Sequence, residues 1–137
     1  MDNRTLNYLA LARKAGLAEL GEEPVGAAAR AGKAHLILVA GDASEHTWRR
    51  AKSFAAGTDQ QVLRLAVTKE EMGFVIGRTS LAIAAITDAS LALALVDTLE
   101  KPDPQVRQVL ADKALKARKH RQEAKAHQRN LRRGKKK

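Results

Sequence analysis

The sequence has no cysteine, few aromatic residues and no long apolar run. Without cysteine there can be no disulfide framework, thiol nucleophile or cysteine-ligated zinc, and a reducing compartment is favoured. Aromatic residues form only 3% of the chain, which leaves little material for the stacking platforms that bind single-stranded nucleic acid. No stretch approaches the ~18 uninterrupted apolar residues that a membrane span needs. We therefore expect a cytoplasmic protein that does not contact a membrane.

Residue patterns of known catalytic sites are also missing. Ser44 and Ser80 have no recognisable base partner, and no glycine-rich phosphate loop follows a predicted strand. The paired carboxylates Glu22-Glu23 and Glu70-Glu71 stand at predicted helix starts, where they interact favourably with the helix dipole. The histidines lack the spacing of a metal site; they are His35, His46, His120 and His127. We expect no enzymatic activity, no cofactor and no bound metal.

Positive charge is concentrated in the last fifth of the sequence. Of 137 residues, 25 are Lys or Arg and 15 are Asp or Glu, which gives a formal net charge of +10. Residues 1–111 hold 13 basic and 13 acidic side chains, whereas residues 112–137 hold 12 and 2. This distribution predicts a neutral body with a cationic extension, which favours a polyanionic partner such as RNA. The alternative is an extension that only adds solubility.

Helices and short apolar runs alternate along the first 100 residues. The run His35–Ala40 is typical of a strand buried on both faces, and D-x-x-E and T-x-x-E patterns at Asp42 and Thr68 predict helix starts. Asp88 is expected to cap the last helix of the body. Helices are predicted near 3–15, 24–31, 42–56, 68–76 and 88–99, and strands at 35–40, 61–67 and 81–86. The alternation predicts an α/β fold, a three-layer α/β/α sandwich.

The segment Lys101–Pro104 interrupts this alternation, because the residue before each proline is disfavoured in a helix. We place a domain boundary here, with a body over 1–100 and a basic extension over 101–137. Residues 105–133 consist largely of good helix formers with a weak apolar stripe. Cationic residues then become more frequent, so we expect a frayed helix that becomes disordered where these charges have no partner, with a helical extension as the alternative. The stripe comprises Val106, Leu110, Ala114 and Ala117.

Four segments of the body carry a family resemblance through their order and spacing. They are ARKAG (12–16), RAGKAHLILVAGDAS (30–44), TKEEMGFVIGR (68–78) and LAIAAITD (81–88). The body resembles the kink-turn-binding ribosomal protein family (large-subunit seven-Ae and thirty-e types) over about residues 4–97. It is most similar to the bacterial branch of ribosomal-protein-like RNA-binding proteins. The resemblance implies a mixed four-stranded sheet, with one further strand at 17–20.

The resemblance also implies an RNA-binding turn at the start of the second helix. A G-x-N-E type pattern of the family falls on Gly21, Glu22, Glu23 and Pro24. Only the glycine is retained, and Ala27 stands where the family has a helical lysine. Glu23 can still accept hydrogen bonds from a guanine edge, whereas Pro24 has no polar side chain. A helix N-terminus additionally presents free N–H groups to a phosphate.

The remaining residues of the expected RNA site come from a loop, two lysines and the extension. The family's second reading loop falls on Gly77, Arg78, Thr79 and Ser80, and Lys14 and Lys33 are expected to flank the same end of the sandwich. Phosphate contacts by the extension are expected from Lys116, Arg118, Lys119, Arg121, Arg132 and Arg133.

These observations predict a monomeric, non-catalytic protein that binds ribosomal or other structured RNA and is thereby associated with the ribosome. The body would select a distorted RNA site, and the extension would add affinity that is independent of sequence. One alternative is a protein-interaction module of the same fold that has lost specific RNA recognition and is tethered by its extension near the ribosome. Another is an accessory substrate-binding domain of an RNA-modifying system that acts in trans.

Overall fold

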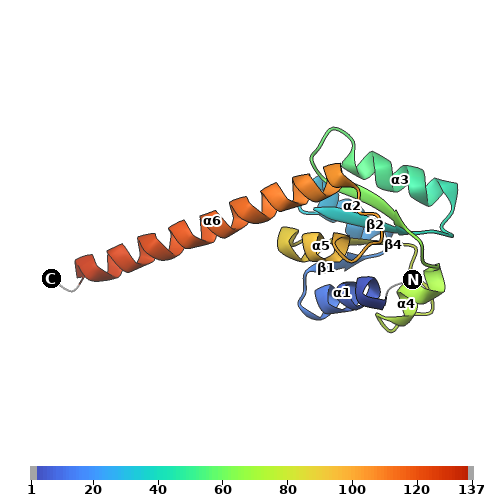
Figure 1. Cartoon of the computed structure of the whole chain (residues 1–137), viewed down its shortest axis with the longest axis horizontal. Helices are drawn as coiled ribbons and strands as arrows, with labels where there is room; N and C mark the ends of the chain where they lie inside the picture. Colours follow the sequence, from blue (N-terminus) through green and yellow to red (C-terminus); the bar gives the residue numbers. More distant parts are fainter. Residues whose placement is uncertain (1–2, 136–137) are drawn as a thin grey trace.

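The computed structural model describes the backbone of residues 3–135 and the side chains of residues 4–129. Six helices and four strands alternate in this part of the chain, and a long helix projects from a layered body (Figure 1). In chain order they are α1 (Asn3–Lys14), β1 (Ala18–Leu20), α2 (Glu22–Arg30), β2 (Leu36–Ala40), α3 (Glu45–Ala55), β3 (Gln61–Leu65), α4 (Lys69–Phe74), β4 (Ile83–Ile86), α5 (Ala89–Val96) and α6 (Pro104–Lys135).

The strands form one mixed sheet in the order β1-β4-β2-β3. Strands β2 and β3 are parallel, and β4 runs antiparallel to both of its neighbours. The short strand β1 is the fourth strand that the family resemblance implied, and it pairs Leu20 with Ala84 of β4. The mixed four-stranded sheet is therefore confirmed.

Alternate residues of the central strand β2 enter two separate cores. Leu36 and Leu38 belong to a core covered by α1, α5 and the start of α6, whereas Ile37 and Val39 face the core beneath α2 and α3. All five residues of β2 are fully buried, as expected of a strand covered on both faces. The α/β/α sandwich predicted from the sequence is confirmed.

Two of the three predicted helix caps are present. The Thr68 hydroxyl accepts from the Glu71 N–H while the Glu71 carboxylate accepts from the Thr68 N–H, and Asp88 accepts from the Leu91 N–H. The predicted cap at Asp42 is wrong, because α3 begins at Glu45 and Ser44 is its N-cap. Asp42 Oδ1 instead accepts from the Lys69 N–H at 2.8 Å and fixes the start of α4.

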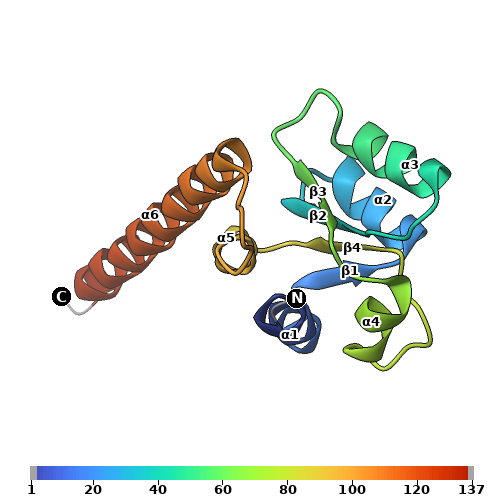
Figure 2. The same ribbon diagram turned by 45° about the vertical axis from the view of Figure 1, so that its right-hand side comes forward.

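Helix α6 continues as a helix to Lys135, which is the helical one of the two forms, helical or disordered, that the sequence allowed for the extension. Its first turns are packed on the sandwich, where Val106, Leu110 and Ala114 are almost fully buried. Beyond them, Ala, Gln, Lys and Arg maintain the helix without an intervening proline. Figure 2 shows α6 projecting away from the sheet. Within residues 3–135, no helix combines the length and apolarity that crossing a bilayer requires.

Candidate nucleic-acid interface

The strand directions divide the connecting segments between two opposite ends of the sandwich. At one end β1 and β2 finish and β4 begins, since Leu20 pairs with Ala84 and Val39 with Ile83. At the other end Leu36 pairs with Ile86. We call the first the Gly21 end, formed by residues 20–23, 41–45, 66–71 and 77–82. We call the second the Lys33 end, formed by residues 13–17, 30–35, 55–60 and 87–89.

Gly21 makes the turn from β1 into α2 in a backbone conformation that only glycine adopts readily, with φ 96° and ψ 164°. Its N–H donates to the Ile83 carbonyl at 3.0 Å, so the turn lies beside the start of β4. The loop that precedes β4 contains Gly77–Ser80. The structure therefore brings the two segments that the resemblance assigned to RNA contact to the same end of the sheet.

The two carboxylates of this turn have different surroundings. Glu22 forms an ion pair with Arg50 of α3, and the Arg50 guanidinium also lies 5.2 Å from the centre of the Phe54 ring. Glu23 is exposed. Of the two, only Glu23 is thus free of an ion pair in the described structure and available to a base edge.

The 77–80 loop is held against α4 by backbone contacts while its polar side chains stay exposed. The Arg78 N–H donates to the Gly73 carbonyl at 2.9 Å. A Cβ on Gly73 would stand 2.6 Å from the Ser80 Cα, so no larger residue fits at this contact. Arg78, Thr79 and Ser80 are all exposed, which leaves them accessible to a ligand.

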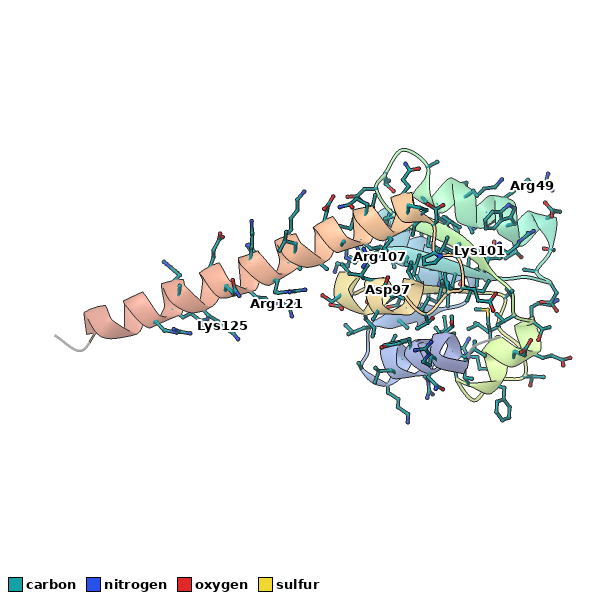
Figure 3. The ribbon with its side chains drawn as sticks, in the orientation of Figure 1. Arg49, Asp97, Lys101, Arg107, Arg121 and Lys125 are labelled. Atoms are coloured by element: carbon teal, nitrogen blue, oxygen red, sulfur yellow. The ribbon has the colours of Figure 1, made fainter. Side chains whose placement is uncertain are left out.

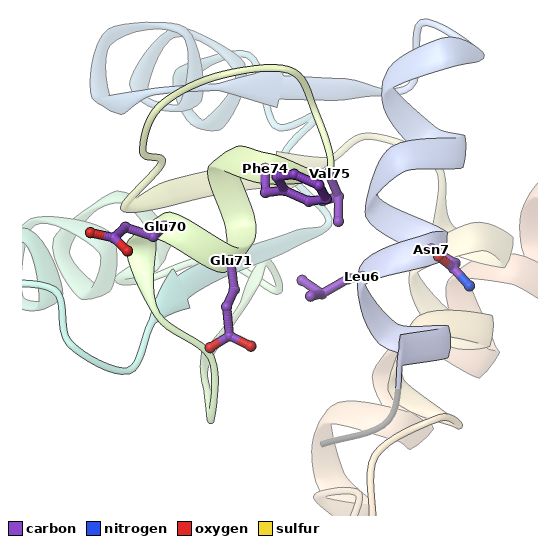
Figure 4. A pocket seen from close by; sticks show the side chains of 6 residues that line it. All are labelled: Leu6, Asn7, Glu70, Glu71, Phe74 and Val75. Atoms are coloured by element: carbon purple, nitrogen blue, oxygen red, sulfur yellow. The ribbon is translucent and has the colours of Figure 1, made fainter.

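Phe74, at the end of α4, was not predicted as a functional residue. Its side chain is 83% exposed and borders a hollow of about 570 Å³ between α1 and α4. Figure 4 shows Phe74 and Val75 on the α4 side of this hollow and Leu6 on the α1 side. Met72 and Ile76 are buried one helical turn apart, so the spacing places Phe74 off the core face. That spacing was the available signal for an exposed aromatic beside the loop.

The Gly21 end is predominantly acidic. Six carboxylates in its segments stand against two cations, because three helices begin here with acidic first turns. The carboxylates are Glu22, Glu23, Asp42, Glu45, Glu70 and Glu71, and the cations are Lys69 and Arg78. Glu22 and Glu45 are paired with Arg50 and Arg64, so four carboxylates without an ion pair among the described side chains stand against Lys69 and Arg78, and a phosphate backbone is repelled on balance.

Lys14 and Lys33 lie at the opposite end from the predicted one. Strand β1 separates Lys14 from Gly21, and α2 returns the chain across the sheet before Lys33. The expectation that both lysines flank the Gly21 end is therefore wrong. The order of elements along the chain decides this placement, and the strand predicted at 17–20 was the available signal that Lys14 and Gly21 lie at opposite ends.

The Lys33 end is predominantly basic and receives part of α6. Arg13, Lys14, Arg30 and Lys33 lie in its segments, against Asp59 and Asp88. A hollow of about 430 Å³ at this end is lined by Gly32, His35, Asp59, Thr87, Asp88, Ala89, Lys113, Lys116 and Ala117. Lys113 and Lys116 of α6 thus add two further cations to this end.

Lys113 anchors α6 to the Lys33 end. Its Nζ lies 2.9 Å from Asp59 Oδ1 and 3.2 Å from His35 Nδ1, and only 13% of its side chain is exposed. Burial, followed by the charge of Lys113, lowers the pKa of His35, whereas Asp59 and Asp88 act in the opposite direction. A neutral His35 accepts the hydrogen bond from the lysine ammonium, which explains how the two groups share this joint.

Beyond this joint α6 leaves the sandwich. We call Lys116–Lys135 the overhang. Lys116, Arg118, Lys119 and Arg121 are exposed, as the phosphate-binding prediction requires. Arg132 and Arg133 lie in the last turns of the helix, and their side chains are outside the described residues.

The chain thus has an α/β/α sandwich fold with a mixed four-stranded sheet. Solved structures of other proteins have the same fold. A Bacillus halodurans protein of unknown function is similar over 73% of this chain and 100% of its own, with 23% identity and a TM-score of 0.66. The Giardia lamblia 15.5kD RNA binding protein is similar over 78% of this chain and 82% of its own, with 17% identity and a TM-score of 0.50. These likenesses show the fold. No protein-family model and no curated protein matches the sequence.

Proposed function

We propose that this protein binds structured RNA and has no catalytic activity of its own. The observation that carries the proposal is the overhang, a fully helical segment whose described side chains are exposed and include six cations against one carboxylate. Polyanions bind such a surface by releasing counterions, and its affinity depends steeply on salt. The shared fold of the Giardia RNA-binding protein supports RNA as the polyanion.

The finer part of the proposal concerns the kind of RNA. The family resemblance, together with the placement of Gly21 beside the 77–80 loop, supports ribosomal or kink-turn-like RNA. Distorted stems expose base edges that Glu23 and Thr79 can contact, and Phe74 offers an exposed ring for an unstacked base. Arg78 would contact an adjacent phosphate.

A protein-interaction module is the second candidate function. The acidic Gly21 end favours it, because Glu23 and Pro24 have replaced polar readers of the resembled family and six carboxylates lie in the segments of this end. In this alternative the overhang tethers the protein to RNA, and the Gly21 end contacts a basic protein.

The experiment is removal of residues 118–137, which spares the buried turns of α6. If about six of the removed cations contact phosphates, those contacts lower the RNA affinity of the full chain on the order of 10³-fold between 50 and 200 mM salt. The truncated chain is expected to lack this part of the decrease. Affinities of the full chain and the truncated chain for an RNA with an internal loop and for its fully paired counterpart are compared at several salt concentrations. A full chain that binds neither RNA at low salt contradicts the proposal. A truncated chain that no longer distinguishes the two RNAs favours the second candidate.

A further inference from the structure

We infer that the overhang and the Lys33 end together form a binding surface for the phosphate backbone of double-helical RNA, opposite the Gly21 end. The inference rests on the proposed function and specifies where and in what form RNA binds. Four structural observations support it: a row of cations on α6, the direction that this row faces, the fixed lysines beside it and the acidity of the other end.

The first observation is that cations of the overhang share one face of the helix. Arg118, Arg121, Lys125 and Arg129 follow one another at intervals of three and four residues, which places them in a single row. Figure 3 shows Arg121 and Lys125 on the same side of α6. None of the four forms an ion pair within the described side chains, so their charges are available to an external anion.

The second observation is that this row continues the face by which α6 packs on the sandwich. Leu110 and Ala114 are buried against the core, and Arg118 follows Ala114 by four residues. The cationic row therefore lies on the side of the overhang that faces the space beyond the Lys33 end. A nucleic acid lying in this space meets α6 on one side and the sandwich on another.

The third observation is that the Lys33 end is held in a fixed shape. The buried Gln60 accepts from the Ala34 N–H at 2.9 Å and donates to the Ala29 carbonyl at 3.2 Å, which fixes the turn that carries Lys33. The Lys113 joint fixes α6 beside this turn. Lys14 and Lys33 are exposed, so they extend the cationic row onto the sandwich.

The fourth observation is the contrast with the Gly21 end, where carboxylates outnumber cations. Because interactions between exposed charges are largely screened beyond ~10 Å at 0.1 M salt, each end acts on a polyanion independently. A phosphate backbone is therefore attracted to the Lys33 end and the overhang and is not attracted to the Gly21 end.

The chemistry of the surface selects a duplex. Helix α6 contains no Phe, Tyr or Trp that could build a stacking platform for unpaired bases, whereas six of the fourteen described side chains of the overhang are cations suited to phosphates. The overhang is 20 residues or ~30 Å long, close to one turn of a nucleic-acid double helix. Since the major groove of A-form RNA is deep and narrow, a helix of this diameter lies along the phosphate rows rather than in that groove.

The test compares two double variants that remove the same charge. R121Q/K125Q removes two cations of the row, whereas R49Q/K101Q removes two exposed cations outside it, Arg49 on α3 and Lys101 in the segment before α6, and Figure 3 shows both away from the overhang. Glutamine retains helix propensity, and circular dichroism verifies that each variant is folded. The probes are a blunt RNA duplex of about 16 base pairs, the span that double-stranded RNA-binding domains cover, and one of its strands alone.

The measured quantity is the ratio of duplex affinity at 50 mM salt to that at 200 mM salt. If both cations contact phosphates, this ratio is roughly tenfold smaller for R121Q/K125Q than for the wild type. R49Q/K101Q is expected to change duplex affinity less than twofold. K14Q/K33Q, like R121Q/K125Q, is expected to lower duplex affinity. Tighter binding of the single strand than of the duplex, or equal losses in R121Q/K125Q and R49Q/K101Q, overturns the inference while the proposed function stands. A wild-type chain that binds no RNA overturns both.

Discussion

The two ends of the sandwich have opposite charge although residues 1–111, which contain both ends, are neutral overall. The Gly21 end collects the starts of α2, α3 and α4 with their acidic first turns. The Lys33 end collects the ends of α1 and α2, where Arg13, Lys14 and Arg30 stand. Each arrangement is favourable for the helix dipole. Helices that run in the same direction beside a sheet can therefore separate charge between the two ends of a small domain.

The largest expected effect concerns the packing of α6 on the sandwich next to the Lys33 end. Leu110 is fully buried, so Leu110→Ala is expected to cost about 2–5 kcal/mol in the free energy of unfolding, through lost contacts and a cavity. Urea denaturation measures the change. The matched variant Leu115→Ala, at a position that is 50% exposed on the same helix, is expected to change stability by less than about 0.5 kcal/mol. Equal effects of the two variants would mean that α6 is not docked.

A second prediction concerns the turn at the acidic end. Gly21→Ala forces a side chain into a backbone region that only glycine occupies readily, and we expect a loss of about 1–3 kcal/mol in stability. At the other end, Gly16 has a left-handed φ of 73°, which asparagine tolerates. Gly16→Asn is therefore expected to be nearly neutral.

Thermal or urea unfolding distinguishes these two glycine variants. Duplex RNA affinity provides a second readout, because a binding surface at the Lys33 end predicts that folded Gly21→Ala protein keeps it. Loss of duplex binding in a folded Gly21→Ala variant would show that duplex RNA also depends on the Gly21 end.

The smallest expected effect arises at the Lys113 joint. Since burial and the charge of Lys113 lower the pKa of His35 below 6.5, the unfolded chain binds a proton at this residue before the folded chain does. Stability is therefore complete above this pH and decreases as the pH falls from 6.5 toward the folded pKa. The relevant measurement is the free energy of unfolding at about pH 7.5 and pH 5.5.

His35→Gln is expected to reduce the decrease in stability, because glutamine can accept the Lys113 hydrogen bond without titrating in this range. The variant His46→Gln, at an exposed position in α3, is expected to retain the wild-type pH dependence. An identical pH dependence in both variants would show that the joint contributes nothing to acid sensitivity.

Local features of the fold could be predicted from the sequence because short-range chemistry determines them. The apolar run ending at Ala40 is the buried strand β2, and the reciprocal hydrogen bonds of Thr68 and Glu71 follow from their spacing. Ser44 competed with Asp42 for the start of α3, and sequence spacing favoured the wrong residue. The decisive contact, between Asp42 and the Lys69 N–H, joins residues 27 positions apart.

The candidate site could be predicted only in part. The resemblance placed Gly21 and Arg78 at one end, as the strand pairing bears out, but it assigned Lys14 and Lys33 to the wrong end. Counting charges over residues 1–111 gave a neutral body and concealed its polarity, because the separation depends on strand direction. The spacing of Met72 and Ile76 indicated that Phe74 is exposed, but its position beside α1 depends on how α4 lies against that helix.

The continuous helix α6 extends far beyond the turns that hold it on the sandwich. Its support consists of the buried turns up to Ala114, the Lys113 joint and the ion pair between Arg107 and Asp97, whose Nε and Oδ1 atoms are 2.7 Å apart (Figure 3). A tilt of about 10° at this support would move the end of a ~30 Å overhang by about 5 Å. A small side-chain change at the root of α6 would therefore displace the far end of the overhang by several times the size of that change.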